Sequence, residues 1–272
     1  MVLRDIRKVI AFVRKEVISA MSYRYAFMSS IAFSLISLLF YFTMAGIFKA
    51  AIIPTAIPYG GDYLAFLITG AILWQMVTFG LYSISSAFTI EMITGTFEMI
   101  YVSRANLLTL LLGVSLFSLL TNAVMIVMSL GLAVAIFGVS IHLESIPLAL
   151  FVLFLTYLSM LGIGMVVAGI TVVTKSVGQV VSIITMLMAA FCGVLIPVEL
   201  LPPEAKALSQ VFPVTYALDA LRNVLLNGTG LEGILTPIAI LVGMALILIP
   251  IGYQLFFICL NIAKKQGTLG QF

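Results

Sequence analysis

The feature that most constrains the fold of this chain is a series of long stretches without a charged side chain. The hydrocarbon core of a bilayer is about 30 Å thick, so a helix rising about 1.5 Å per residue needs about 20 apolar residues to cross it. Such stretches predict six spans: Tyr25–Phe48, Tyr63–Thr89, Leu107–Phe137, Pro147–Thr174, Ser176–Ile196 and Gly233–Leu260.

The composition supports this prediction. Hydrophobic residues make up 63% of the 272 residues and charged residues only 8%, against about 45–50% and about 25% in soluble domains. No stretch is polar enough to form a separate soluble domain. We therefore expect an all-α polytopic membrane protein with a single transmembrane domain, residues 1–272, whose first five spans occupy residues 25–196.

The lysines and arginines predict the orientation. With the N-terminus inside, ten of the 13 basic residues are cytoplasmic. Cytoplasmic loops of membrane proteins carry an excess of Lys and Arg, and six spans return the C-terminus to the same side. We expect a multi-pass protein of the cell membrane with both termini, including the tail 261–272, in the cytoplasm. The remaining, external set is Lys49, Lys206 and Arg222.

The first 24 residues combine a basic face with an apolar stripe. Ile6, Val13 and Val17 recur at helical spacing, while Arg4 and Lys8 lie away from them. This pattern is typical of an amphipathic helix at the inner membrane surface, where cations meet anionic headgroups. A solvated N-terminal helix is the alternative.

Residues 197–232, before the sixth span, do not follow the pattern of a simple loop. Pro203 and Pro213 suit helix starts and Gly228 suits a helix end. Both helices are too short to span, and broken helices at membrane depth occur only when packed in protein or lining a wet cavity. We expect an extracellular re-entrant hairpin, with an amphipathic loop on the outer leaflet as the alternative. On the second helix one stripe is apolar and the other contains Thr215, Asp219 and Arg222; the apolar stripe is Val214, Ala217/Leu218, Leu221 and Val224/Leu225. The candidate gate residues are Pro197, Pro202, Pro213, Tyr216, Asp219 and Arg222, the last two pairing at i and i+3 on the polar face.

No catalytic constellation is present in the sequence. The single histidine, His142, lies in a short segment expected to be external, and no catalytic triad or metal-binding spacing is found. Residues 169–176, GITVVTKS, resemble a phosphate-binding loop, but Thr174 replaces the second glycine and no soluble strand precedes it. We expect no enzyme, no directly bound cofactor or metal and no nucleic-acid partner. Mid-span polar side chains are limited to Gln75, Asn122, Gln179 and Gln254, which disfavours an ion-coupled carrier.

Two glutamates follow the second span, in EMITGTFEMIYVSRAN (residues 91–106). On a helix over residues 90–101, Glu91 and Glu98 share one face, because a seven-residue step returns to within about 20°. Ile90, Phe97 and Tyr101 gather on the other face. This pattern predicts a short amphipathic helix that shows two carboxylates to the cytoplasm; the alternative is a solvated loop whose acids keep it out of the membrane.

These features together resemble the permease subunits of type 2 ABC exporters, over essentially the whole chain. In that family a Glu and a following GT-hydrophobic-E motif form a coupling helix that docks into the ATPase subunit. Arg104 after Ser103 departs from the family's frequent Ser-Pro. The residues that match the coupling motif are Glu91, Gly95, Thr96, Phe97 and Glu98. A second family pattern, G-x-x-x-P…LP…P-x-T-Y-x-x-x-x-x-R…G, lies before the last span; the residues that match it are Gly193, Pro197, Leu201, Pro202, Pro213, Thr215, Tyr216, Arg222 and Gly228.

The resemblance implies an ATP-driven exporter that moves an amphipathic or hydrophobic cargo: a drug, a lipid or a peptide. It implies two copies of a separate ABC ATPase subunit, which carry ATP and Mg, and a second permease copy, forming a homodimer or a pair with a sister permease. The alternatives are a permease for a lipid-linked glycan or polysaccharide, and an ATP-independent carrier or channel.

Overall fold

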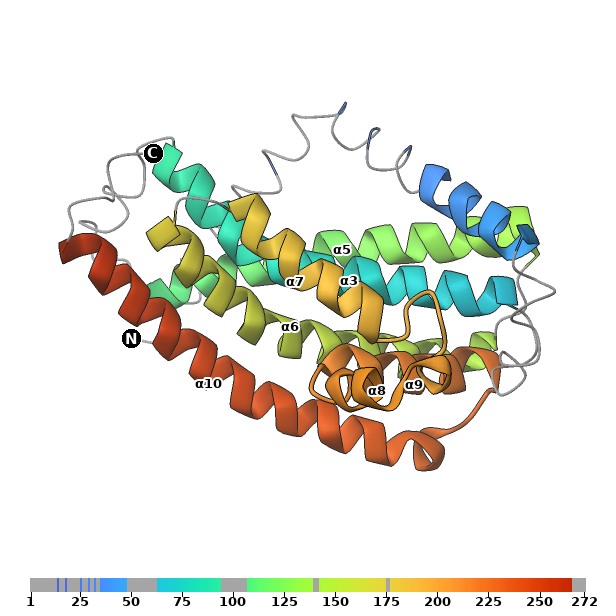
Figure 1. Cartoon of the computed structure of the whole chain (residues 1–272). Helices are drawn as coiled ribbons and strands as arrows, with labels where there is room; N and C mark the ends of the chain where they lie inside the picture. Colours follow the sequence, from blue (N-terminus) through green and yellow to red (C-terminus); the bar gives the residue numbers. More distant parts are fainter. Residues whose placement is uncertain are drawn as a thin grey trace.

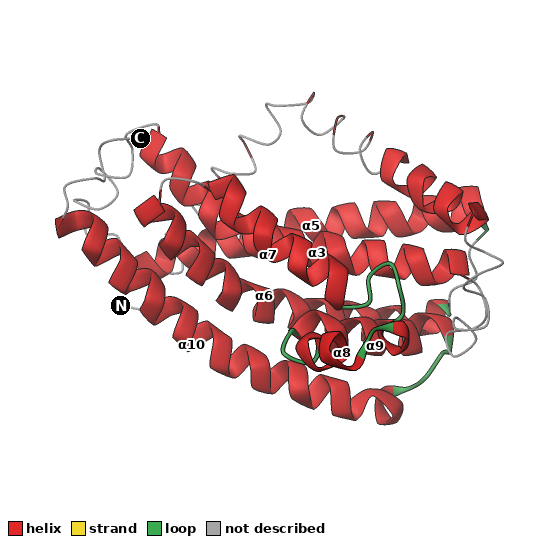
Figure 2. Cartoon of the chain, in the orientation of Figure 1, coloured by secondary structure: helices red, strands yellow, loops and turns green. Residues whose placement is uncertain are grey.

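The computed structural model describes residues 35–47, 63–93, 107–138, 142–174 and 177–265, together with five single residues: Arg14, Ile18, Tyr25, Ser29 and Ala32. Within these residues every regular element is helical (Figure 2), as the sequence predicts. After an apolar helix, Leu35–Ile47, come α3 (Tyr63–Ile93), α5 (Leu107–Phe137), α6 (Ile146–Thr174), α7 (Val177–Phe191), α8 (Pro203–Ser209), α9 (Pro213–Leu226) and α10 (Leu235–Lys265), with short 3-10 turns η2 (Leu143–Ser145), η3 (Val198–Leu200) and η4 (Leu231–Ile234).

Four helices are long and apolar enough to cross a bilayer, counting only the described residues. The apolar segments are Tyr63–Ile90, Gly113–Phe137, Ile146–Thr174 and Leu231–Lys265, the last of which joins η4 and α10. They overlap the predicted second, third, fourth and sixth spans. The predicted first span is described in part, as the helix Leu35–Ile47.

The predicted fifth span differs from the observed helix. The α7 helix has 15 residues, which is about 22 Å at 1.5 Å per residue and less than the hydrocarbon thickness. It ends at Phe191 rather than at Ile196, because the chain bends from Cys192 onward and Gly193 has a φ of +83°. Only glycine adopts this left-handed conformation without a steric penalty.

The α6 helix lies at the centre of the bundle, between α3 and α10 (Figure 1). Small residues on α6 allow the neighbouring helices to approach closely. A Cβ added to Gly162 would lie 2.5 Å from the backbone of Leu248 on α10, and one added to Gly164 would lie 2.5 Å from the carbonyl oxygen of Gly80 on α3. Backbones therefore touch where a larger side chain would separate them, which is how membrane helices gain packing energy without a hydrophobic driving force.

Hydrogen bonds also tie the helices together. The Tyr157 hydroxyl of α6 donates to the Ser115 carbonyl of α5 at 2.7 Å, and the Ser159 hydroxyl donates to the Leu241 carbonyl of α10 at 3.3 Å. Polar side chains inside a membrane bundle find partners on other helices because lipid offers none. The result is a firm α3–α6–α10 core, with α5 and the Leu35–Ile47 helix packed on its side.

Candidate functional site

The α3 helix runs unbroken from the bend after α7 to the predicted coupling segment. At its first residue, the Tyr63 hydroxyl donates to the Leu195 carbonyl at 3.2 Å. Its last turn contains Glu91, and the helix continues to Ile93, about 45 Å from its start at 1.5 Å per residue. The second span and the beginning of the predicted coupling helix are thus one rigid element.

The rest of the predicted coupling segment is not described. Gly95, Thr96, Phe97, Glu98 and Arg104 lie outside the described residues, as does nearly all of the predicted N-terminal helix 1–24. Their conformations and roles stay predictions.

The region between α7 and α10 forms a helix–turn–helix. The α8 helix begins at Pro203 after Pro202, α9 begins at Pro213, and Gly228 follows the end of α9 with a φ of +63°. Proline fits the first helical turn because its missing N–H has no helical partner there. The Thr215 hydroxyl donates to the Ser209 carbonyl at 2.6 Å, which ties the two helices together.

The apolar stripe predicted on α9 faces the bundle. Its side chains are at most 2% exposed, and α9 contacts α3, α6 and α10. The hairpin is therefore packed against protein on this face (Figure 1). The stripe is Val214, Ala217, Leu218, Leu221, Val224 and Leu225.

The sequence predicts Arg222 on a polar face with Asp219 and does not predict how deeply its side chain is buried. The structure buries Arg222, at 3% exposure. Its Nη2 donates to the carbonyl oxygens of Phe66, at 3.4 Å, and Val194, at 3.3 Å. The guanidinium carbon lies 3.4 Å from the centre of the Phe66 ring. We call Arg222, Phe66 and Val194 the arginine clamp, because one side chain joins α9, α3 and the bend after α7.

Gly70 leaves the room that the arginine clamp needs. A Cβ at this position would lie 2.6 Å from the Val194 carbonyl oxygen and 3.1 Å from Arg222 Nη2. A guanidinium can be buried here because carbonyl dipoles and an aromatic face compensate for part of its lost hydration.

Asp219 stays on the outer face of α9. Its Oδ1 accepts a hydrogen bond of 3.0 Å from the Asn223 amide, one turn later. Although the side chain is exposed, partial desolvation by the surrounding protein raises the pKa of Asp219 above its usual value. The Asn223 hydrogen bond lowers the pKa, the Glu199 charge raises it and the Arg222 charge lowers it, each less than desolvation does. The net effect is a raised pKa.

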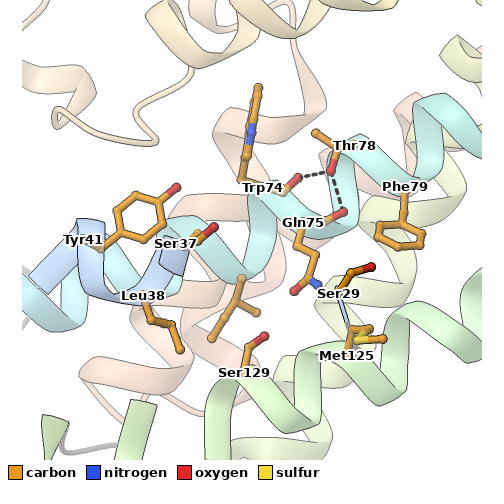
Figure 3. Close-up of a pocket in the computed structure, with 12 residues that line it drawn as sticks. Ser29, Ser37, Leu38, Tyr41, Trp74, Gln75, Thr78, Phe79, Met125 and Ser129 are labelled. Carbon is orange, nitrogen blue, oxygen red and sulfur yellow. Dashed lines mark hydrogen bonds between the residues drawn. The ribbon is translucent and has the colours of Figure 1, made fainter. Parts of the chain in front are cut away.

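The helix Leu35–Ile47, α3 and α5 border a pocket of about 770 Å³ (Figure 3). On α3 its lining residues follow Phe66 of the arginine clamp along the same helix. Side chains from all three helices line it, including Tyr41, Trp74, Gln75, Phe79 and Ser129. Gln75 and Asn122 are two of the polar residues that the sequence places within the predicted spans. The structure brings them together, with the Asn122 amide donating to the Gln75 carbonyl at 3.4 Å. Gln179 and Gln254 are exposed instead.

No hydrolytic or metal site is found in the described part of the chain. It contains no group of three or more His, Cys, Asp or Glu side chains able to hold a metal ion. His142 is exposed, and its ring lies against Gly228, with Nδ1 3.3 Å from the Leu225 carbonyl oxygen. The histidine therefore packs at the end of α9.

A comparison with protein families decides the class of this architecture. The model of the ABC-2 type transporter family matches residues 7–226, from the predicted N-terminal helix through α9. This chain belongs to the ABC-2 type transporter family. A comparison with curated proteins gives no significant match. Membership makes the protein a membrane transport component and implies an ABC ATPase subunit as its partner. The candidate functional site of this chain consists of the pocket, the arginine clamp and the Glu91 end of α3.

Proposed function

We propose that the chain is the permease subunit of an ATP-driven exporter, which forms the path for an amphipathic or hydrophobic cargo such as a drug, a lipid or a peptide. The observation that carries this proposal is the course of α3. One helix of 31 residues passes from Glu91 along the pocket to Phe66 of the arginine clamp. A continuous helix is one of the elements that can carry energetic coupling between two distant sites.

The energy source in this proposal is a separate subunit. Two ATPase subunits, which hold ATP and Mg, dock on the coupling residues Glu91, Gly95, Thr96, Phe97 and Glu98 of two permease copies. The two copies form a homodimer or a pair with a sister permease. ATP binding shifts the permease only if ATP favours one conformation of the complex over the other.

The proposed movement begins at the coupling segment and ends at the hairpin. Closing of the ATPase pair pushes on the Glu91 end of α3, and the helix shifts against the Leu35–Ile47 helix and α5, which changes the pocket. At the other end, α3 pulls on Phe66, and Arg222 passes the movement to α9. The hairpin with Pro197, Pro202, Pro213 and Tyr216 then acts as the outer gate.

Charge reversal at the predicted docking surface tests the proposal. Glu98→Lys should weaken binding of the partner ATPase, sought in the neighbouring reading frame, by about tenfold or more. The reason is that a like-charge contact at an interface costs several kcal/mol, and about 1.4 kcal/mol is tenfold. The measurements are co-purification, ATPase activity in lipid and export, beside a check of membrane insertion.

The matched control is Glu144→Lys. Glu144 is an exposed acid in the first turn of η2, at the end of the bundle near α9. This variant should bind the ATPase and export normally. Normal ATPase binding and export by Glu98→Lys, at normal expression, would contradict the coupling assignment. Transport without any ATPase subunit would favour the carrier or channel instead, and stimulation by polyprenyl-linked glycans alone would favour the glycan permease.

A further inference from the structure

The pocket between the Leu35–Ile47 helix, α3 and α5 has the size of a small-molecule site. Its volume of about 770 Å³ lies within the about 300–1,000 Å³ typical of ligand pockets. Above it, Ala45 and Tyr41 of the first helix pack against the cluster of Tyr63, Phe66 and Leu67 on α3. The ring of Phe42 lies 4.9 Å from that of Phe137 at the end of α5. These contacts join the first helix to α3 and α5, which border the pocket.

The described residues that line the pocket include no ionisable side chain other than a tyrosine hydroxyl. None of its 12 described lining residues is Asp, Glu, Lys, Arg or His. A charge without a partner in a low-dielectric site costs several kcal/mol or more. The pocket therefore selects against ions and accepts neutral molecules.

The lining is nonetheless partly polar. The Gln75 side chain extends from α3 into the space between α3 and α5 (Figure 3). The amide of Gln75 offers both a donor and an acceptor, and the Tyr41 hydroxyl offers the same from the first helix. The Thr78 hydroxyl instead donates to the carbonyls of Trp74, at 3.0 Å, and Gln75, at 2.9 Å, within its own helix.

Aromatic and aliphatic side chains supply the rest of the surface. Trp74 and Phe79 contribute aromatic rings to the lining, and Leu38, Ile72 and Met125 contribute apolar side chains. Aromatic rings bind flat or chain-like apolar groups through large contact areas, and methionine adapts to varied shapes. A few polar groups in an apolar wall are what small-molecule sites use to orient a ligand.

We propose that this pocket is a binding site for uncharged amphipathic molecules, with a hydroxyl or carbonyl group on Gln75 and Tyr41 and an alkyl or aromatic body against Trp74 and Phe79. That the bound molecule is the exported cargo rests on the proposed function; that the pocket binds this class of molecule does not.

The chain offers a direct probe, because Trp74 is its single tryptophan. The purified permease in phosphatidylcholine nanodiscs is titrated with three dibrominated probes of equal chain length: a monoacylglycerol, a fatty-acid anion and an alkyltrimethylammonium. Bromine quenches tryptophan fluorescence on contact. We expect saturable quenching by the monoacylglycerol, at a half-saturating mole fraction at least tenfold lower than for either ion. Equal, unsaturable quenching by all three would mean that Trp74 meets only bulk lipid and would overturn the proposal.

Substitution of Gln75 tests the polar part of the site. Gln75→Met keeps the length of the side chain and removes its hydrogen bonds, so it should raise the half-saturating fraction of the monoacylglycerol about tenfold. The matched control is Gln254→Met on α10, an exposed residue that does not line the pocket; it should leave the titration unchanged. Unchanged binding by Gln75→Met, in a protein with the same emission maximum and elution volume, would overturn the role of Gln75.

These measurements use the permease without its ATPase. Absent binding with intact ATP-dependent export would refute this site and leave the proposed function standing. Saturable binding with no ATPase partner would support the site and refute the proposed function.

Discussion

Arg222 is the residue on which the hairpin, α3 and the bend after α7 all depend. A lysine at this position keeps the charge but loses the flat stack on Phe66, and its single ammonium cannot reproduce the geometry of the guanidinium. Arg222→Lys should lower the free energy of unfolding by about 2–4 kcal/mol, because a buried charge loses part of its compensation. Thermal unfolding in nanodiscs measures this, and a midpoint equal to wild type would contradict the clamp.

Gly70 gives an independent test of the same contact. A methyl group at Gly70 would press on the Val194 carbonyl and on Arg222 Nη2. Gly70→Ala should therefore destabilise by about 1–3 kcal/mol, although alanine favours helices over glycine by about 1 kcal/mol. The control is Gly243→Ala on α10, where nothing lies within 4 Å of the added methyl; this variant should be neutral or slightly more stable. Equal midpoints for the two variants would contradict the tight contact.

Asp219 predicts a small pH dependence. Its pKa is raised in the folded protein, first by burial, so the folded state holds the proton more tightly than the unfolded state. The stability that this group contributes is fully present below the ordinary Asp pKa of about 3.8 and is lost as pH rises through the raised pKa. Asp219→Asn should therefore gain stability relative to wild type at pH 7 but not at pH 3.5. Midpoints at both values measure this, with Glu204→Gln, an exposed acid of α8, as the control. The same difference in midpoint between Asp219→Asn and wild type at both pH values would contradict the predicted pH dependence.

The burial of Arg222 and its carbonyl partners could not be predicted from the sequence, for a physical reason. A helical wheel groups Arg222 with Thr215 and Asp219 by residue type, but the acceptors that bury its guanidinium come from Phe66 and Val194, 156 and 28 positions away. No residue near Arg222 in the sequence indicates that these carbonyl groups are its partners. The apolar stripe of α9 could be predicted because it depends on residue type and period alone.

At the scale of elements, apolar length predicted the long helices well. Spans such as Ile146–Thr174 need only a charge-free run that exceeds the bilayer thickness. The end of α7 was missed, because the bend after Phe191 depends on a glycine inside an apolar run that carries no charge to mark it. The pocket could not be predicted either, since it arises where three helices meet; the sequence marked Gln75 only as a polar residue within a span.

The contact between α6 and α10 predicts a second glycine effect. A methyl group on Gly162 meets the backbone of Leu248, which cannot rotate away as a flexible side chain can. Gly162→Ala should separate the helices and destabilise the protein by about 1–3 kcal/mol. Gly131→Ala on α5, which has open space at the added methyl, serves as the matched control in the same unfolding experiment. A wild-type midpoint for Gly162→Ala would show that the two helices are not held this closely.

At the scale of the whole molecule, α3 joins features that the sequence presents as unrelated. The predicted docking residue Glu91, the pocket residue Gln75 and the clamp residue Phe66 lie along one uninterrupted helix. If that helix transmits the force of ATP binding, coupling between the pocket and the ATPase depends on the stiffness of the helix between Gln75 and Glu91 as well as on its contacts.

Softening α3 between those two residues tests this transmission. Ser86 and Ala87 are half-buried and do not line the pocket, and replacing each by glycine costs a helix about 1 kcal/mol or less. The double variant should retain saturable quenching of Trp74 by the neutral probe, because the pocket is untouched. Stimulation of the partner ATPase by that probe should fall several-fold, because a flexible joint absorbs the displacement. Ser86→Ala, which strengthens the helix, should keep full stimulation. Full stimulation by the double-glycine variant would mean that coupling runs through another helix, with α6, the neighbour of α3 at Gly80 and Gly164, the next element to soften.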